Sequence, residues 1–545
     1  MAKGYRPVDR DQPFLLPPDM REWLPGDHPV WLVITVVADH LDTSAFHARR
    51  RTGGAGTAGY DPDMLVTVLV WAYLHGITSS REIERLCGTD VAFRVICGGN
   101  WPDHVSFARF RADFPGAVAG LFAEVLKLCA RLGMGRLGVV ALDGMKIAAS
   151  ASKSASRTED TLARLAGETV AAHGAADAAE DELFGAGRRG DEVPEDAWSP
   201  RRRDGRIAAA LAGLKAGRDA AEAEQAAKAE AFRARQRSGQ RTGAAPKQAA
   251  VQLAEENLAR VRAARAAQLA KLAERHAAGQ PDRRNRAAGI DDHCRVREAR
   301  AKLEAARARA AEAGRKAAGR EAARKGPGPV RNITGPDSRL MPVRGGGFIQ
   351  GYNTQNMTSG DGLLIATELT DDQAGCPSFQ PMLANGQQAA ALIAAHRPAP
   401  GHPGGSQEQD GIGLTLADAG YCSEANLTCG GPDRLIAVGK HRDLEKAARD
   451  PDSDSPGWGG PAIQAMRERL KTPDGIAAYR HRGHIAETPH GHIKHNMGFR
   501  QLSMRGKRKA AAEWTFAAAV HNLSKALTTG HLTSQALAAL AGPAT

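Results

Sequence analysis

The stretch GRLGVVALDGMKIAASAS, residues 135–152, decides the fold class. Its apolar run from Leu137 to Leu142 lies between glycines and ends on Asp143, which is typical of a buried strand that delivers an acid to the edge of a sheet. An aspartate before Gly144 also fits a turn, because Asp-Gly is a common turn pair. The stretch therefore predicts a first strand within 134–153, with a turn as the alternative setting of Asp143.

The segments on either side of this strand differ in amino-acid composition. Residues 1–133 predict a helical N-terminal domain, because apolar residues recur at helical spacing from Asp61-Pro62 onward and short polar breaks separate the helices. Residues 154–330 are rich in Ala, Arg and Glu and nearly free of aromatic residues, again with apolar positions at helical spacing. They predict a long, coiled-coil-like helical hairpin inserted into another domain.

Strand patterns return after this insertion. A helix from Phe379 to Ala395 is expected among four strands, which are GGGFIQGYNTQNMT, GLLIATELT, GLTLADAG and RLIAVGK. Without the insertion the order is strand, strand, strand, helix, strand, short helix, strand, helix. That order predicts an α/β, ribonuclease H-like mixed sheet flanked by helices. Residues 331–530 would complete it, and 531–545 would form a C-terminal tail.

Composition limits the class of protein. The 73 Lys and Arg against 61 Asp and Glu give a net charge of +12 and a pI near 9.5, which suits a polyanionic partner without identifying it. The seven cysteines form no Cys-x-x-Cys pair, so neither disulfide staples nor a clustered thiolate site is expected. The first residues lack the layout of a signal peptide, and no apolar run approaches the roughly 20 residues of a membrane span. We expect a cytoplasmic protein.

Three acids are candidates for one site. Asp143 and Asp418 both end apolar runs, and Glu487 lies in a helical segment. Carboxylates that bridge Mg²⁺ or Mn²⁺ ions roughly 4 Å apart are what two-metal phosphoryl transfer needs. Asp371 and Asp372 follow the third strand and are rivals of Asp418, but that strand would carry them away from Asp143. A loop or helix-entry aspartate is the alternative role of Asp418.

The third acid shares a helix face with other polar side chains. At about 100° per residue, Tyr479, Arg482, Glu487 and Lys494 fall within an arc of roughly 140°, which is broad but one-sided. Pro489 interrupts this pattern and predicts a break just after Glu487.

These residues resemble the Y-R-E-K signature of bacterial insertion-sequence DDE transposases, with two, four and six residues between Tyr479, Arg482, Glu487 and Lys494. Other segments resemble the same family, namely ALDGMKI, ADAGYCSEAN, DSRLM, GYNTQN, EWTFAAAVHNLSKA and the helical DPDMLVTVLVWAYLHG that precedes the core. Two features depart from the family pattern. His490 stands where many relatives have an aromatic residue, and the insertion is not part of the core pattern.

The resemblance implies a function. Asp143, Asp418 and Glu487 would be the catalytic metal ligands for two Mg²⁺ or Mn²⁺ ions, and Tyr479, Arg482 and Lys494 would bind DNA phosphates. The partner would be double-stranded DNA, as terminal inverted repeats and as target, bound by a homodimer or higher oligomer associated with the nucleoid. The reaction would be cleavage at the element ends and transfer of a 3′ hydroxyl into the target. A ribonuclease H-like nuclease or resolvase without strand transfer, and a domesticated noncatalytic DNA-binding protein, remain alternatives.

Basic and histidine residues give further hypotheses. Sequence-specific DNA contacts, or alternatively protomer contacts, are expected from helices that carry Arg81, Arg85, Arg94, Arg109 and Arg111. Nonspecific phosphate contacts, or simply charged surface, are expected at Arg201–Arg203, Arg283, Arg284, Arg286 and Arg505–Lys509. A zinc site is not expected at His481, His484, His490, His492 and His495, because no cysteine lies close by.

Overall fold

The computed structural model describes residues 19–48, 59–168, 203–238, 245–246, 249–279, 289–322, 330–343, 346–398, 410–439 and 459–541. The chain forms two compact units. One comprises Met1–Ala155 with Thr334–Thr545, and the other comprises Ser156–Ile333. Of the basic residues named above, Arg201, Arg202, Arg283, Arg284 and Arg286 lie outside the described residues.

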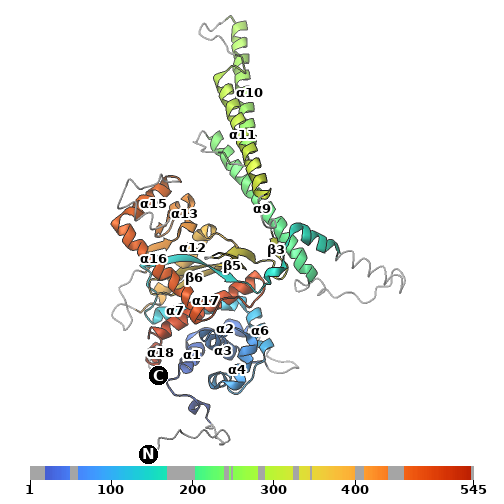
Figure 1. Ribbon diagram of the computed structural model, residues 1–545. Coiled ribbons are helices and arrows are strands. Elements are labelled where there is room, and N and C mark those ends of the chain that lie inside the picture. Colours follow the sequence, from blue (N-terminus) through green and yellow to red (C-terminus); the bar gives the residue numbers. More distant parts are fainter. Residues whose placement is uncertain are drawn as a thin grey trace, which may run out of the picture. The chain divides into compact units, whose positions relative to one another are not determined.

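A mixed sheet forms the centre of the first unit (Figure 1). Its strands are β1 (Val139–Ala148), β4 (Arg339–Pro342), β5 (Phe348–Thr358), β6 (Leu364–Thr370), β7 (Leu414–Ala417) and β8 (Asp433–Ile436). The order is β4-β5-β1-β7-β8, and β6 also pairs with β5. The β1–β5 and β5–β6 pairs are antiparallel, whereas β1–β7 and β7–β8 are parallel. The protein is therefore an α/β protein with a mixed sheet.

Strand β1 lies within the predicted bounds 134–153 but continues past Asp143. It does not end on Asp143, and the Asp-Gly pair is not a turn, because Asp143 to Ala148 stay paired with β5. The burial pattern explains the continuation, since Met145 and Ile147 are buried and alternate with Gly144 and Lys146. The parallel pairing with β7, by contrast, stops at Leu142.

Helices cover both faces of this sheet. On one face, Gly386 of α12 (Phe379–His396) lies against the sulfur of Met357 in β5. A Cβ at this position would collide with that sulfur, so glycine allows the close approach of the helix to the strand. On the other face, the buried Trp514 of α17 (Lys507–Thr528) bonds to Asn356 of β5. Helix α16 (Pro473–Gly491) packs against β1, β5 and β7, and α15 (Pro461–Lys471) against β8. Short elements join these, namely η5 (Cys376–Ser378), η6 (Ala419–Tyr421) and α13 (Glu424–Thr428).

The N-terminal residues form the predicted series of helices. They are η1 (Met20–Glu22), α1 (Pro29–Thr35), the π-helical η2 (Val36–His40), α2 (Ser44–His47), α3 (Pro62–Leu74), α4 (Ser80–Thr89), α5 (Val91–Cys97), α6 (His104–Asp113) and α7 (Pro115–Arg131). Asp61, Asp90 and Asp103 cap α3, α5 and α6 through side-chain bonds to backbone N–H groups. Their buried residues belong to the same hydrophobic core as those of the sheet and α17.

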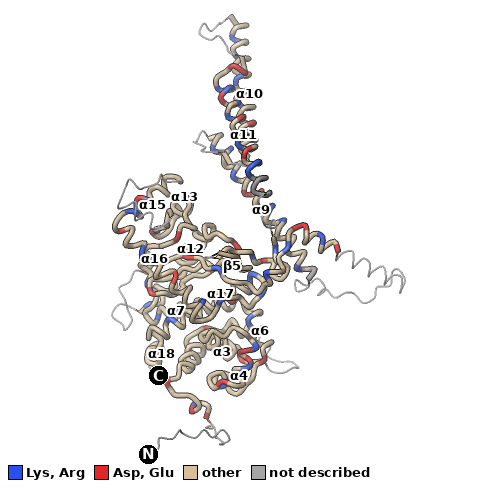
Figure 2. Tube along the Cα trace, in the orientation of Figure 1, with Lys and Arg blue, Asp and Glu red and all other residues tan. Residues whose placement is uncertain are grey.

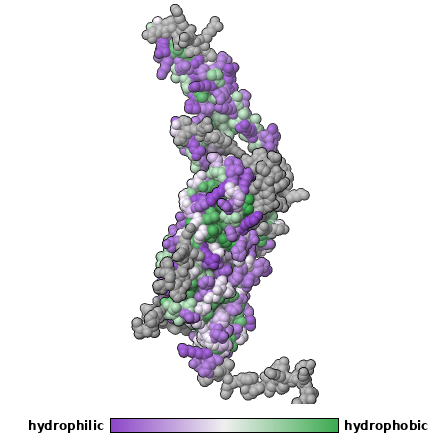
Figure 3. Space-filling view, turned by 90° about the vertical axis from the view of Figure 1, so that its left-hand side faces the viewer, coloured by the Kyte–Doolittle hydropathy of each residue, from purple (hydrophilic) through white to green (hydrophobic). Residues whose placement is uncertain are grey.

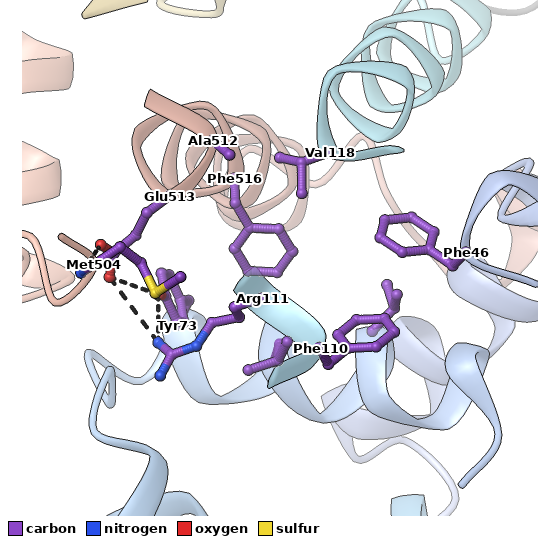
Figure 4. A pocket seen from close by; sticks show the side chains of 11 residues that line it. Phe46, Tyr73, Phe110, Arg111, Val118, Met504, Ala512, Glu513 and Phe516 are labelled. Carbon is purple, nitrogen blue, oxygen red and sulfur yellow. Dashed lines mark hydrogen bonds and ion pairs between the residues drawn. The ribbon is translucent and has the colours of Figure 1, made fainter. Parts of the chain in front are cut away.

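The contact between these helices and α17 includes a buried carboxylate (Figure 4). Glu513 accepts hydrogen bonds from the Ser503 and Met504 backbone N–H groups, each at 2.9 Å, and from the Tyr73 hydroxyl at 3.3 Å. Arg111 lies 4.0 Å from the same carboxylate and donates to the Tyr73 hydroxyl at 3.1 Å. Beside them is a pocket whose apolar lining includes Phe46, Phe110, Val118 and Phe516. The Arg111 guanidinium is therefore part of an internal network.

Helix α16, near the C-terminal end, differs from expectation. Pro489 does not divide α16, which continues to Gly491 and passes into the π-helical η8 (His492–Asn496). The C-terminal segment 531–545 contains α18 (Ser534–Ala541), where Leu537 is buried, in agreement with a helical pattern that runs to near Leu540.

The second unit is mostly helical. Within the described residues it contains the long helices α9 (Arg203–Arg237), α10 (Ala250–Ala277) and α11 (Cys294–Ala322), one more than the two arms of the expected hairpin. Alanine-rich sequence favours this additional helix. Acidic and basic residues alternate along the three helices (Figure 2), and hydrophilic residues predominate on the face drawn in Figure 3. Arg233 of α9, for example, pairs with Glu256 of α10 at 2.7 Å.

The second unit begins and ends in paired strands. After the short η3 (Lys153–Ala155), β2 (Ser156–Thr158) pairs antiparallel with β3 (Val330–Asn332). A small apolar cluster in this unit contains Leu162, Ile207, Leu214 and Ile333. The chain thus enters and leaves the unit at neighbouring points.

Candidate active site

The sheet register brings Asp143 and Asp418 together. Leu142 is the last residue of β1 that pairs with β7, and its partner is Ala417. Asp143 and Asp418 are the residues that follow these two on parallel neighbouring strands. Asp418 then caps η6, because its side chain accepts from the Gly420 N–H at 2.9 Å. The two acids predicted from separate parts of the sequence therefore lie side by side where the pairing of β1 with β7 stops.

Arg482 of α16 lies between these two carboxylates. Its Nη2 is 3.0 Å from Oδ1 of Asp143 and 3.7 Å from Oδ2 of Asp418. The Asp143 and Arg482 side chains are mostly buried, with exposed fractions of 16% and 15%, whereas Asp418 is 45% exposed. One positive group thus contacts both acids, and the pair is open to solvent on the side of Asp418.

The surroundings of Asp143 and Asp418 disfavour the ionised form of both carboxyl groups. Burial raises the pKa of Asp143, and the charge of Arg482 opposes this. Burial also raises the pKa of Asp418, and the negative charge of Asp143 raises it further. Nearby positive charge stabilises both carboxylates, and hard oxygen ligands are those preferred by Mg²⁺ and Mn²⁺. The residues present therefore fit a divalent cation.

Glu487 lies on α16, little more than one turn beyond Arg482, and is exposed. Its negative charge contributes to the raised pKa of Asp143 and acts also on Arg482 and His490. Helix α16 therefore brings the third predicted acid close enough to influence the first electrostatically.

The other residues of the signature differ in their surroundings. Tyr479 is buried, and its hydroxyl donates to the carbonyl oxygen of Ala417 at 3.2 Å. Burial raises the pKa of Tyr479 to about 12. Lys494 lies on η8 and is half-buried, and this desolvation lowers its pKa. Arg482 and Lys494 supply positive charge at the site, whereas Tyr479 supports the end of β7.

The structure adds residues that were not predicted as part of the site. Nδ1 of His490 lies 4.0 Å from Oδ2 of Asp143, and its Nε2 lies 3.1 Å from Nδ2 of Asn356. Burial lowers the pKa of His490 to about 4. Lys146 donates to the Gln373 carbonyl at 2.6 Å, and its charge acts on Asp418. Lys146 belongs to the DGMKI segment and Asn356 to the GYNTQN segment. The sequence shows both residues, but only the register between β1 and β5 shows on which face of the sheet each side chain lies.

The rivals of Asp418 are engaged elsewhere. Asp371 forms ion pairs with Arg339 and Lys507, each at 2.7 Å. Asp372 bonds with Thr370 at the end of β6. Within the described residues, a group of three ligand atoms that all lie within 4.8 Å of one another is formed by His47, Asp61 and Asp63, outside this site, where His47 and Asp63 are bonded to each other at 2.9 Å.

Comparisons with known proteins give two family matches. Residues 18–113 match the transposase domain DUF772, and residues 460–527 match a transposase DDE domain, which includes Arg482, Glu487 and Lys494. No curated protein and no solved structure matches the chain. Among the described residues, no helix combines the length and apolar character needed to cross a membrane. The two matches, one near each end of the chain, support its recognition as an insertion-sequence DDE transposase.

Proposed function

We propose that the protein binds the ends of its insertion sequence and catalyses metal-dependent DNA strand cleavage and strand transfer. The convergence of Asp143 and Asp418 on one cationic group carries this proposal. The strand order β6-β5-β1-β7-β8, with only the first two pairs antiparallel, supports a ribonuclease H-like catalytic domain.

Asp143, Asp418 and Glu487 would hold the metal, which we expect to be two Mg²⁺ or Mn²⁺ ions. When bound, these ions supply a positively charged centre that activates the attacking oxygen and stabilises the leaving oxygen at phosphorus. The chain itself contributes rigidity, since Asp143 is fixed within β1 and Asp418 within the cap of η6. Water would attack in cleavage, and a DNA 3′ hydroxyl in strand transfer.

Positive residues beside the acids would hold the DNA backbone. Arg482 lies on α16 beside the carboxylates of Asp143 and Asp418, and Lys494 lies on η8, where its charge acts on His490. Both side chains would contact phosphate oxygens close to the cut. The Tyr479 hydroxyl already donates to the carbonyl oxygen of Ala417, so its role would be to hold the end of β7 and thereby Asp418 in position.

The remaining surfaces suggest where DNA and a second protomer would bind. We propose that the helices of 1–133 recognise the terminal inverted repeats, and that the protein acts as a homodimer or higher oligomer on the DNA. Residues 134–153 and 331–530 would form the catalytic domain, and the 154–330 insertion would contribute to protomer or DNA contacts. The domain match at 18–113 supports a role of the N-terminal helices in transposition.

Cleavage and joining of end-labelled DNA test the proposal. Purified full-length protein with Mg²⁺ should cut DNA that carries the ends of the element and join the new 3′ end to a second duplex. Asp143→Asn, Asp418→Asn and Glu487→Gln should each remove both activities and keep DNA binding. Glu468→Gln on α15 is the control, because this exposed residue pairs only with Lys471 among the ion pairs of the described chain.

The outcomes separate the competing functions. Cleavage without joining would identify a nuclease or resolvase and end the transposase proposal. DNA binding without cleavage in the wild-type protein would identify a noncatalytic DNA-binding protein. Full cleavage by any one of the three acid variants would remove that residue from the site.

A further inference from the structure

A line of hydrogen bonds leads from α17 through β5 to the candidate active site. Trp514 donates from its indole Nε1 to Oδ1 of Asn356 at 3.1 Å, and Thr367 donates from its hydroxyl to the same oxygen at 2.8 Å. The same indole N–H also donates to the Thr367 hydroxyl oxygen at 2.5 Å, so it is shared between the two acceptors. An amide NH2 group 3.1 Å from the indole N–H would place donor against donor, so the amide atom that faces Trp514 and Thr367 is the oxygen. The orientation of the buried Asn356 amide is therefore determined by its neighbours.

This orientation determines where His490 carries its proton. With Oδ1 on Trp514, the NH2 group of Asn356 is directed to Nε2 of His490 at 3.1 Å and to the Thr354 hydroxyl at 3.1 Å. An amide NH2 can only donate, so Nε2 must accept and carries no proton. The imidazole is therefore neutral, with its single proton on Nδ1.

The protonated nitrogen faces the first acid. Nδ1 of His490 lies 4.0 Å from Oδ2 of Asp143, about 1 Å beyond an ordinary N–H···O bond. The other oxygen, Oδ1, accepts from the Gly144 N–H at 2.9 Å and pairs with Arg482 at 3.0 Å. The two oxygens of Asp143 thus have different neighbours, a cation on one side and a neutral ring on the other.

We propose that His490 is a positioning residue for Asp143, held by Asn356 and Trp514 in the neutral Nδ1–H form so that it donates to Oδ2 when the site closes on DNA. This inference rests on the proposed function. Hydrogen bonds at active sites are often long in the free enzyme and shorten in the reacting complex. A neutral donor orients the carboxylate without adding a full positive charge that would compete with a divalent cation.

The variant Asn356→Asp tests the assignment directly. A carboxylate still accepts from Trp514 and Thr367 but cannot donate to His490, so the ring must place a proton on Nε2. The ¹⁵N chemical shifts of the imidazole, measured on the full-length protein without DNA or metal, distinguish the two tautomers. We expect the Nδ1–H form in the wild-type protein and a protonated Nε2 in the variant. A wild-type spectrum with the proton on Nε2 would overturn the proposal, whatever the activity of the protein.

Kinetics then test the positioning role. Asn356→Asp and His490→Phe should each lower kcat for cleavage roughly 10- to 100-fold, the range expected when the support of a metal ligand is removed, with little change in the Kd for DNA. His490→Asn, which restores an N–H donor near the position of Nδ1, should recover part of the loss relative to His490→Phe. His484→Phe, at an exposed position on the same helix, is the control and should leave kcat unchanged.

The results distinguish failure of this inference from failure of the proposed function. Wild-type kcat in the folded His490→Phe variant would show that the ring has only a structural role and would overturn the inference. Absence of cleavage in the wild-type protein would refute the proposed function, while the tautomer measurement would still decide the state of His490.

Discussion

The hydroxyl of Tyr479 donates to the carbonyl oxygen of Ala417 at 3.2 Å, one residue before Asp418. This bond ties the middle of α16 to the end of β7, where the second acid leaves the sheet. The tyrosine of the signature thereby holds an acid in place through the backbone, from a position that is 8% exposed.

Loss of this hydroxyl should affect catalysis more than folding. Tyr479→Phe keeps the buried ring and removes one neutral hydrogen bond, so the free energy of unfolding should fall by about 1 kcal/mol. We expect kcat for cleavage to fall while the Kd for DNA stays the same. Tyr60→Phe is a matched control, because the Tyr60 hydroxyl also donates to a backbone carbonyl, that of Trp101, at 3.1 Å on the surface. Equal kcat in the two variants would contradict the role of Tyr479.

Gly144 should tolerate no side chain. A Cβ at this position would lie 3.1 Å from both Oδ1 of Asn353 and Nε2 of Gln355, which are buried on β5. Gly144→Ala should therefore lower the free energy of unfolding by about 1–3 kcal/mol, the usual cost of overpacking, and reduce cleavage by displacing Asp143. Gly138→Ala is the control, since a Cβ there meets nothing within 4 Å. Chemical denaturation of both variants measures the difference.

The buried carboxylate of Glu513 should be important for stability. Glu513→Gln places an NH2 group against donors that now bind an oxygen, so about 1–3 kcal/mol of unfolding free energy should be lost. Glu298→Gln, which breaks an exposed pair with Lys302, should change it by less than about 1 kcal/mol. Thermal and urea unfolding provide the comparison, and equal effects of the two changes would show that the Glu513 network contributes little.

His521 should make the protein sensitive to acid. Burial lowers its pKa from 6.5 to about 3, and its ring bonds the Gly362 carbonyl and His492. Because the folded-state pKa lies below the unfolded value, its contribution to stability is complete above pH 6.5 and is lost as the pH falls towards 3. For each proton taken up on unfolding, the free energy of unfolding falls by about 1.4 kcal/mol for every pH unit of acidification in this range.

Unfolding at pH 7, 6 and 5 measures this dependence. His521→Asn should remove about one proton from the slope of stability against pH. The same slope in the His521→Asn variant and the wild-type protein would exclude His521 as the source of the acid sensitivity.

The sequence allowed some of these features to be predicted because they follow from local pattern. The apolar runs before Asp143 and Asp418 indicate strands, and the parallel register that pairs Leu142 with Ala417 places the next residues side by side. The continuation of β1 to Ala148 could not be predicted from Asp-Gly alone, because it depends on β5, which lies far along the chain. Tertiary pairing here outweighs a turn propensity.

Features that depend on contacts between distant segments were missed. Pro489 predicts a break, but α16 continues through this buried residue to Gly491. The sequence shows His490 only as a departure from an aromatic pattern. Its relation to Asp143 requires Asn356 on β5 and Trp514 on α17, which no spacing in the sequence connects.

The pairing of β2 with β3 has a consequence for the history of the gene. Ser156 lies opposite Asn332, so the long helical unit is attached through two adjacent chain ends. Such a unit can be acquired or lost as a cassette, with a short hairpin left in its place, and the register of β1 against β5 need not change. Two otherwise similar chains could thus differ greatly in length and still position the same pair of aspartates.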